Sequence, residues 1–137
     1  DCKNPYVKKL YCEKDKTADY YIGSCQLTAD GIAEIMLTAY PSLIIPPDES
    51  KWISNINRDG DGNVLGLSVC GIRMSCEEFR SLFDIRSPSF DISYTQRLYS
   101  FTTRGDGCNC GMSVYSALKL SERGYSARQI LNEFYNL

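Results

Sequence analysis

Histidine is absent from this 137-residue chain, and long hydrophobic runs and blocks of basic residues are absent too. Without an imidazole, a cysteine nucleophile lacks its usual general base, and a zinc site lacks one of its preferred ligands. Without a long apolar run, no segment has the length of a transmembrane helix. With no Lys/Arg block and a net charge of −2, the chain has no electrostatic footprint for nucleic acid.

Internal repeats, low-complexity tracts and a signal peptide are also missing. The chain opens Asp1-Cys2-Lys3-Asn4-Pro5 rather than with Met, so we expect a mature or trimmed product. A length of 137 residues with 43% hydrophobic residues fits a single domain, residues 1–137, with one core.

Cysteine, in contrast, is plentiful. Seven cysteines in a domain of this size favour disulfides and an extracytoplasmic location, whether secreted, periplasmic or cell-wall associated. The odd number leaves at least one thiol free or paired outside the chain. Zinc at Cys108-x-Cys110 is the alternative, although zinc motifs prefer two or more intervening residues. Cys70 and Cys76 flank a short predicted turn and are candidate neighbours. The disulfide candidates are Cys2, Cys12, Cys25, Cys70, Cys76, Cys108 and Cys110.

Tyrosine is the second excess, with ten residues against five Phe and one Trp. A tyrosine ring is apolar and its hydroxyl is polar, so a tyrosine-rich surface suits amphipathic ligands such as sugars. The alternative is that most of these rings cover the core.

The first third of the chain predicts one helix. Residues 1–26 are polar and irregular, and we expect cysteines to hold them in place. Thr28 predicts an N-cap, and Pro41 ends the helix that follows it. Residues 41–50 form a predicted loop. The apolar stripe of this helix is Ile32, Ile35, Met36 and Tyr40.

The middle of the chain predicts a β-hairpin. Strand-like runs cover 52–56 and 64–69, and Asp59-Gly60-Asp61-Gly62-Asn63 between them has strong turn chemistry. The alternating acids also suggest calcium. The EF-hand pattern fails, however, because Val64 replaces its glycine and Cys70 its glutamate.

The last half predicts three helices and more β-structure. Ser75 with Glu78 is a capping box that opens a short helix, and residues 87–103 are β-rich. A glycine-rich loop over 104–111 precedes a helix over 112–123, for which Gly124 is a C′ residue. Ser126 caps a final helix. The predicted fold class is α+β, a small mixed or antiparallel sheet with about four short helices, disulfide-stapled.

One segment carries a family resemblance. Residues 103–117 read Thr-Arg-Gly-Asp-Gly-Cys-Asn-Cys-Gly-Met-Ser-Val-Tyr-Ser-Ala. This resembles the stage II sporulation protein D and amidase-enhancer family, whose pattern is Gly-Arg-Gly-Trp-Gly-His-Gly-Val-Gly-Met-Ser-Gln-Tyr-Gly-Ala. Eight of fifteen positions agree: Arg104, Gly105, Gly107, Gly111, Met112, Ser113, Tyr115 and Ala117.

Weaker matches lie on both sides of this segment. Downstream, Gly124-Tyr125-Ser126, Ile130-Leu131 and Phe134-Tyr135 resemble the family's ending. Upstream, Asn4-Pro5-Tyr6-Val7 resembles its Pro-Tyr-Leu entry segment, and Ser87 to Phe90 its Ser-x-x-Phe. The stretch from Asp59 through Glu77, Phe79 and Arg80 resembles its turn, strand and Glu-x-x-Arg.

The residue types of this segment also indicate a ligand-binding site, independently of the family resemblance. Glycines permit positive φ and close approach of the backbone to a ligand, and the helix that follows points free N–H groups into the loop. Such a place suits sugar hydroxyls, acetamido carbonyls or a carboxylate, with Arg104 as a bidentate donor. The alternative is a structural turn that packs a helix against a strand. The predicted glycan-binding residues are Arg104, Gly105, Gly107, Gly111, Met112, Ser113 and Tyr115.

The segment departs from the family pattern at four positions. The family's His falls at Cys108, its Trp at Asp106, its next Gly at Asn109 and its Val at Cys110. Any role that needs an imidazole in this loop is therefore lost, and Cys108 and Cys110 are candidates to pin the loop by disulfides.

The resemblance implies peptidoglycan processing like that of a lytic transglycosylase, which needs a carboxylic acid beside the glycosidic oxygen. In the family that Glu precedes the Pro-Tyr-Leu entry segment, and no residue here matches it, so no catalytic residue is assigned. Glu77 and Glu78 open a helix, whose dipole lowers a carboxyl pKa, the wrong direction for an acid. Asp106 in the glycine-rich loop is the one acid to test.

Two functions follow for the chain. The first is processing of peptidoglycan glycan strands, with the catalytic Glu on a segment absent from this chain. The alternative is a non-catalytic extracytoplasmic module that binds glycan or a cell-wall amidase, as an amidase enhancer does. A secreted structural domain without ligand is a third. No cofactor is expected apart from the zinc alternative.

Overall fold

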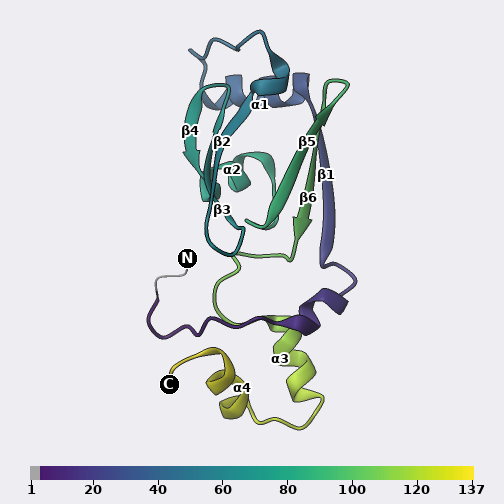
Figure 1. Ribbon diagram of the computed structural model, residues 1–137, viewed down its shortest axis with the longest axis vertical. Helices are drawn as coiled ribbons and strands as arrows, with labels where there is room; N and C mark the ends of the chain where they lie inside the picture. The colour runs from purple at the N-terminus through teal and green to yellow at the C-terminus, as the bar shows by residue number, and fades with distance from the viewer. Residues whose placement is uncertain (1–3) are drawn as a thin grey trace.

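Two three-stranded antiparallel sheets stand above a small helical region in the computed structural model, which describes residues 4–137 (Figure 1). The first sheet has the order β1-β6-β5 and consists of β1 (Ile22–Thr28), β5 (Phe90–Thr95) and β6 (Leu98–Arg104). The second has the order β2-β3-β4 and consists of β2 (Ile53–Arg58), β3 (Val64–Val69) and β4 (Ile72–Ser75). With four α-helices, the fold is α+β, as the sequence predicts.

Turn chemistry sets the predicted β2–β3 hairpin, and it also sets a β5–β6 hairpin whose turn the sequence analysis does not predict. Between β2 and β3, the Asp59 carboxylate accepts hydrogen bonds from the N–H groups of Asp61 and Asn63, both at 2.9 Å. Between β5 and β6, Gln96 and Arg97 have φ of 51° and 64°, the left-handed conformation of a tight hairpin turn. The predicted β-rich stretch over 87–103 is therefore the β5–β6 hairpin.

Two strands lie where the sequence predicts none. β1 falls partly in the stretch predicted to be irregular, and it pairs along its length with β6, from Ile22 opposite Arg104 to Thr28 opposite Leu98. Its residues alternate between exposed and half-buried, so β1 has no buried apolar face to mark it. β4 is four residues long and replaces the predicted turn before the second helix. Both strands are stabilised by pairing, β1 with the distant β6 and β4 with the adjacent β3, rather than by local propensity alone.

The helices begin at side-chain caps. They are α1 (Ala29–Ala39), α2 (Cys76–Phe83), α3 (Val114–Ser121) and α4 (Ala127–Phe134), with short 3₁₀ turns η1 (Glu13–Thr17) and η2 (Glu49–Lys51). The caps predicted at Thr28, Ser75 and Ser126 are confirmed, because each hydroxyl accepts from the N–H three residues on. None of the helices in the described chain has the length and hydrophobicity needed to cross a bilayer.

Gly124 ends α3 as predicted. Its φ is +86°, its N–H donates to the Ser121 carbonyl at 2.9 Å, and the Tyr125 N–H reaches back to the Leu120 carbonyl at 3.2 Å. This pair of hydrogen bonds is the Schellman motif, which needs a residue in the left-handed conformation at the C′ position, here Gly124.

The molecule divides into two lobes with separate interiors. We call residues 22–104 the β lobe, and residues 4–18 together with 113–137 the α lobe (Figure 1). Both sheets, α1 and α2 contribute to the β-lobe core, in which Phe79 packs on Phe90 at 5.6 Å between ring centroids. In the α lobe, Ala18, Ile130 and Phe134 are buried apart from that core. Residues 19–21 and 105–112 join the lobes.

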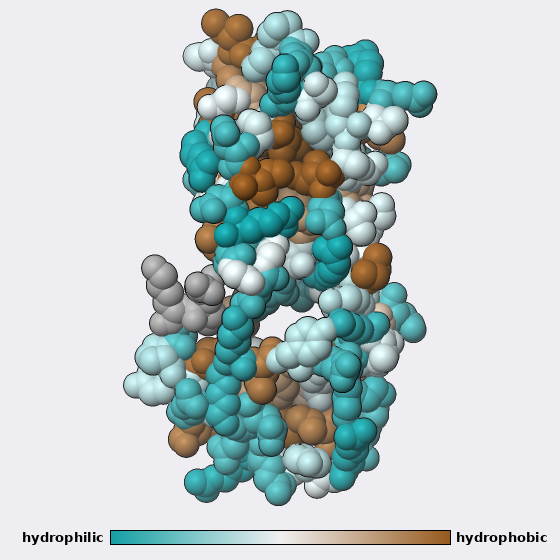
Figure 2. All heavy atoms as spheres, in the orientation of Figure 1, coloured by the Kyte–Doolittle hydropathy of each residue, from teal (hydrophilic) through white to brown (hydrophobic). Residues whose placement is uncertain are grey.

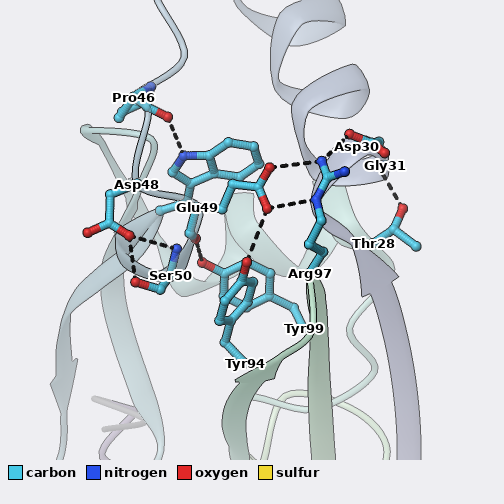
Figure 3. A network of polar contacts seen from close by, with 11 residues as sticks. Thr28, Asp30, Gly31, Pro46, Asp48, Glu49, Ser50, Tyr94, Arg97 and Tyr99 are labelled. Carbon is cyan, nitrogen blue, oxygen red and sulfur yellow. Dashed lines mark hydrogen bonds and ion pairs between the residues drawn. The ribbon is translucent and has the colours of Figure 1, made fainter.

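A polar network closes the end of the β lobe far from the α lobe (Figure 3). The Arg97 guanidinium donates two hydrogen bonds to the Glu49 carboxylate, at 3.0 and 2.8 Å, and a third to Asp30 at 2.7 Å. The Tyr94 hydroxyl also donates to Glu49, at 3.1 Å. The β5–β6 turn is thereby tied to η2 and α1.

The expected disulfides are not supported at five of the candidate positions. Five of the candidates carry free thiols: Cys12, Cys25, Cys70, Cys76 and Cys108. Cys110 is disulfide-bonded, and Cys2 lies outside the described residues. The predicted neighbours Cys70 and Cys76 lie at opposite ends of β4, a span of about 13 Å for four residues, which is beyond the reach of a disulfide.

The thiols of Cys70 and Cys76 belong instead to the hydrophobic core. Burial raises the pKa of Cys70 to about 11 and also raises that of Cys76. Both side chains therefore stay protonated at neutral pH and pack as small apolar groups.

Candidate functional site

A cleft of about 550 Å³ lies at the boundary between the two lobes, where Figure 2 shows the surface deeply hollowed. The α lobe contributes two of the lining residues, Tyr11 and Lys16, and the β lobe contributes most of the others. The lining residues are Tyr11, Lys16, Tyr21, Ile22, Arg58, Asp61, Gly62, Ser89, Asp91 and Arg104. Of the predicted glycan-binding residues, Arg104 lies in this cleft.

A smaller hollow of about 240 Å³ on the outer side of β3 and β4 is lined by Arg73 and Glu78 among others. The Glu78 carboxylate there already accepts bonds from the N–H and hydroxyl of Ser75, at 2.7 and 2.8 Å. The inter-lobe cleft is larger and richer in aromatic and charged groups, so it is the stronger candidate.

Two arginines flank one carboxylate in the cleft. Arg104, at the end of β6, donates a short hydrogen bond to Asp91 Oδ2 on the neighbouring strand β5. Arg58, at the end of β2, lies 3.9 Å from Asp91 Oδ1. Arg58 is itself fixed by hydrogen bonds to the carbonyls of Gly62 at 2.8 Å and Phe90 at 2.9 Å. The two sheets therefore bring two guanidinium groups and one carboxylate together in the cleft.

Tyrosine and aliphatic side chains also line the cleft. The Tyr11 side chain is exposed, at 74%, and the Lys16 ammonium lies 4.9 Å from its ring centroid. Ile22 is 59% exposed at the start of β1, and Tyr21 beside it is half-buried. The cleft thus combines exposed apolar surface with fixed donors and acceptors.

The predicted loop has the backbone that its glycines imply. Gly105, Gly107 and Gly111 have φ of +75°, +120° and +90°. The N–H groups of Gly105 and Gly107 donate to the carbonyls of Tyr21 at 2.7 Å and Arg86 at 2.9 Å. These two donors hold the loop against the β lobe rather than pointing to an external ligand.

The start of α3 already holds a carboxylate from the chain itself. Ser113 is the N-cap, and its hydroxyl accepts from the Ser116 N–H and donates to Asp15 at 2.6 Å. The Ser116 hydroxyl donates to the same Asp15 oxygen at 2.7 Å. A carboxylate is favoured at a helix N-terminus, and η1 provides it here.

The remaining predicted residues contact the ends of the chain. The Met112 N–H donates to the Tyr135 hydroxyl at 3.2 Å, and a Cβ on Gly111 would lie 3.3 Å from that hydroxyl. The Tyr115 hydroxyl lies 3.3 Å from the hydroxyl of Thr17. Residues 111–115 therefore join η1, α3 and the C-terminal segment.

The carboxyl groups with a displaced pKa are displaced downward. Hydrogen bonds from Ser75 hold the pKa of Glu78 below its usual value, as predicted for this helix start. Hydrogen bonds from Arg97 do the same for the pKa of Glu49, and Lys51 does so for that of Asp48. A general acid needs the opposite shift. Asp106 lies exposed in the loop.

A metal centre finds no support in the part of the chain that the structure describes. Within residues 4–137, no group of three or more His, Cys, Asp or Glu side chains is arranged to hold an ion. At the predicted Cys108-x-Cys110 pair, the Cys108 thiol donates to the Cys110 carbonyl at 3.4 Å, and Cys110 is disulfide-bonded.

Compared with models of known protein families and with curated protein sequences, the chain gives no match. The likeness of residues 103–117 to the sporulation protein D family therefore stays a resemblance.

Sequence reasoning missed most of the cleft. Tyr11, Arg58 and Asp91 come from segments predicted only as irregular or β-structure, and no short motif joins them. The excess of tyrosine is the one composition signal that points toward such a surface.

Proposed function

We propose that this chain is a peptidoglycan-binding module, which holds glycan strands in the cleft between its two lobes. The observation that carries the proposal is the composition of the cleft, whose lining combines Tyr11 and Tyr21 with Arg104, Asp91 and Arg58. Sugars have apolar C–H faces and hydroxyl edges, so they suit an aromatic surface next to fixed polar groups.

Within peptidoglycan processing, we assign the chain binding rather than cleavage. The two acids that line the cleft are ion-paired: Asp61 with Lys9 at 2.8 Å, and Asp91 with Arg104. Charged carboxylates in such pairs accept hydrogen bonds from sugar hydroxyls, whereas a transglycosylase needs a protonated acid. The proposed role agrees with the amidase-enhancer side of the resemblance. A cell-wall amidase partner and an extracytoplasmic location stay predictions.

The test is binding of soluble glycan strands, measured by isothermal titration calorimetry on the wild type and on Tyr11→Ala. Loss of one aromatic contact of about 1.4 kcal/mol weakens binding about tenfold. Tyr125→Ala is the matched control, because Tyr125 is 43% exposed on the α3–α4 connection, away from the cleft.

Two results contradict the proposal. Absence of binding by the wild type removes the glycan function. Equal losses of glycan affinity in the Tyr11 and Tyr125 variants would place any binding outside the cleft. Release of anhydro-muropeptides by this chain would show cleavage and overturn the assignment to binding alone.

A further inference from the structure

We propose that the outer edge of β1 pairs with β1 of a second copy of this chain, in an antiparallel two-fold dimer. The strand lies on the outside of the β lobe, next to β6 (Figure 1). The pairing joins the three-stranded sheet of each copy into one six-stranded sheet. This inference goes beyond the proposed glycan binding and does not depend on it.

The first support is a row of backbone groups on β1 that point away from its own sheet. Just before the strand, the Tyr21 carbonyl accepts a hydrogen bond from the Gly105 N–H at 2.7 Å, so Tyr21 faces β6. Backbone direction alternates along an antiparallel ladder, so the N–H and C=O groups of Ser24 and Gln26 face outward. Within residues 4–137, these outward groups make no hydrogen bond to another segment.

The second support is that β1 lacks the features that protect exposed sheet edges. Protected edge strands carry a charged residue, a proline or a bulge, or are very short. β1 is seven residues long, reads Ile-Gly-Ser-Cys-Gln-Leu-Thr, and pairs with β6 in one register without a shift. Of the other edge strands, β2 has register shifts, β4 is four residues long and β5 carries Asp91. An edge as regular and uncharged as that of β1 suits a partner strand.

The third support is that β1 is complementary to itself. When two copies overlap along the whole strand, Ser24 lies opposite Gln26 of the second copy, and two-fold symmetry repeats this pair. Both residues face outward, so each pair exchanges two backbone hydrogen bonds, about four in all. No charged side chain occurs in β1, so no like charges meet along the pairing. These features favour a second copy as the occupant of the edge.

The same register places Cys25 at the two-fold axis, opposite Cys25 of the second copy. Because the backbone of Cys25 faces β6, the two cysteines form a non-hydrogen-bonded pair, whose Cα atoms lie about 4.5 Å apart. This spacing is within the range of a disulfide. Cys25 carries a free, half-buried thiol. A covalent link between the two thiols therefore reports the register, since any other register sets Cys25 opposite a different residue.

The experiment measures self-association by sedimentation equilibrium in the presence of a reductant. A single edge pairing is a small interface, so we expect the wild type to become mainly dimeric toward about 100 μM protein. Ser24→Pro should weaken the dimer about tenfold, because each copy loses one backbone donor to the other. Proline is tolerated at an edge position whose N–H faces outward. Ser24→Ala is the matched control, because it keeps the N–H and should dimerise like the wild type.

A second variant tests the edge without changing the backbone. Gln26→Lys places a lysine on each copy, and in the full-overlap register the two lysines are diagonal neighbours across the new strand pair. The dimer should weaken, because an edge lysine opposes strand pairing. Far-UV circular dichroism and Trp52 fluorescence check that each variant is folded.

Oxidation of the wild type tests the register. Diamide converts two thiols to one disulfide and takes up their two protons and two electrons as it becomes a hydrazine. We expect a covalent dimer in which mass spectrometry identifies a link between two Cys25 residues, and Cys25→Ser should lose that link. Peptide mapping is needed because Cys108 is an exposed free thiol that diamide also oxidises.

Three results overturn the dimer. A wild type that stays monomeric at about 1 mM rules out a second copy and points to a strand of another protein as the occupant. A dimer that both Ser24→Pro and Gln26→Lys leave unchanged uses a different surface. Covalent dimers linked through Cys108 and never through Cys25 contradict the full-overlap pairing. Glycan binding, tested by Tyr11→Ala, stands or fails separately from all three.

Discussion

The two lobes are stabilised in different ways. The β lobe has a large apolar core in which Phe79, Phe90 and Phe101 are fully buried. The α lobe buries only a few apolar side chains, and its centre contains the Asp15 carboxylate with its two serine hydroxyls. Hydrophobic burial therefore dominates one lobe, while hydrogen bonds contribute a larger share in the other.

The α lobe also brings together the two ends of the chain. The Lys8 N–H donates to the Phe134 carbonyl at 2.9 Å, and the Asn136 N–H donates to the Tyr6 carbonyl at 2.7 Å. Contacts between such distant residues close the longest loop in the molecule, which costs chain entropy. We expect the α lobe to be the less stable region, with local opening before global unfolding.

The largest expected effect comes from a pair of core substitutions. Phe79→Ala should lose about 3–5 kcal/mol of unfolding free energy, and Phe134→Ala an amount near the lower end of that range. Trp52, the single tryptophan, is buried in the β lobe. The urea midpoint reported by its fluorescence should fall strongly for Phe79→Ala and weakly for Phe134→Ala. If Trp52 fluorescence and far-UV circular dichroism gave the same urea midpoint in both variants, the lobes would unfold as one unit.

Asp15→Ala tests the polar centre of the α lobe. Two serine hydroxyls lose their acceptor and the start of α3 loses a nearby negative charge, so we expect a loss of about 1–3 kcal/mol. The helical circular dichroism signal should fall at lower urea, while Trp52 fluorescence changes little. Asp19→Ala is the control, because Asp19 is exposed in the connection between the lobes. Equal effects of the two variants would show that the hydrogen bonds from Ser113 and Ser116 to Asp15 do not stabilise the α lobe.

A matched pair of helix caps gives a smaller effect. Ser75→Ala removes the capping box of α2 in the β lobe, and Ser126→Ala removes that of α4 in the α lobe. Each should cost about 1 kcal/mol. Only the first should lower the urea midpoint reported by Trp52. A similar fall of the Trp52 urea midpoint in Ser126→Ala would contradict the expectation that the two lobes unfold independently.

The smallest effect is a pH dependence confined to the β lobe. Arg97 holds the pKa of Glu49 below its ordinary value of 4.5. The stabilisation is therefore present above pH 4.5 and is lost as the pH falls through the lower folded-state pKa. In Glu49→Gln, the unfolding free energy measured by Trp52 fluorescence should fall less steeply as the pH is lowered below 4.5. An unchanged pH dependence would assign the acid sensitivity to other carboxyl groups.

Local sequence signals predicted the elements that depend on neighbouring residues. The caps at Thr28, Ser75 and Ser126, the Asp59 turn and the end of α3 at Gly124 are all confirmed. Each depends on hydrogen bonds within a few residues, so the sequence is enough to find them. β1 and β4 were missed because their pairing partners, β6 and β3, decide their structure.

The candidate site was only partly predictable. Arg104 was identified from the glycine-rich segment and lies in the cleft. The other predicted residues that the structure places, from Gly105 to Tyr115, are engaged in contacts with η1, the β lobe and the C-terminal segment. The loop supplies the connection between the lobes, and its glycines supply the backbone conformations that this connection needs.

The sequence by itself determined the fold class, the caps of α1, α2 and α4 and the β2–β3 turn, because short-range hydrogen bonds and hydrophobic periodicity specify them. Only the tertiary structure decided that Asp15 binds the hydroxyls of Ser113 and Ser116, that Cys70 and Cys76 lie apart, and that Tyr11 lines the same cleft as Arg104. Those positions are set by contacts between distant segments, whose pairing depends on how the whole core packs. No local pattern encodes them.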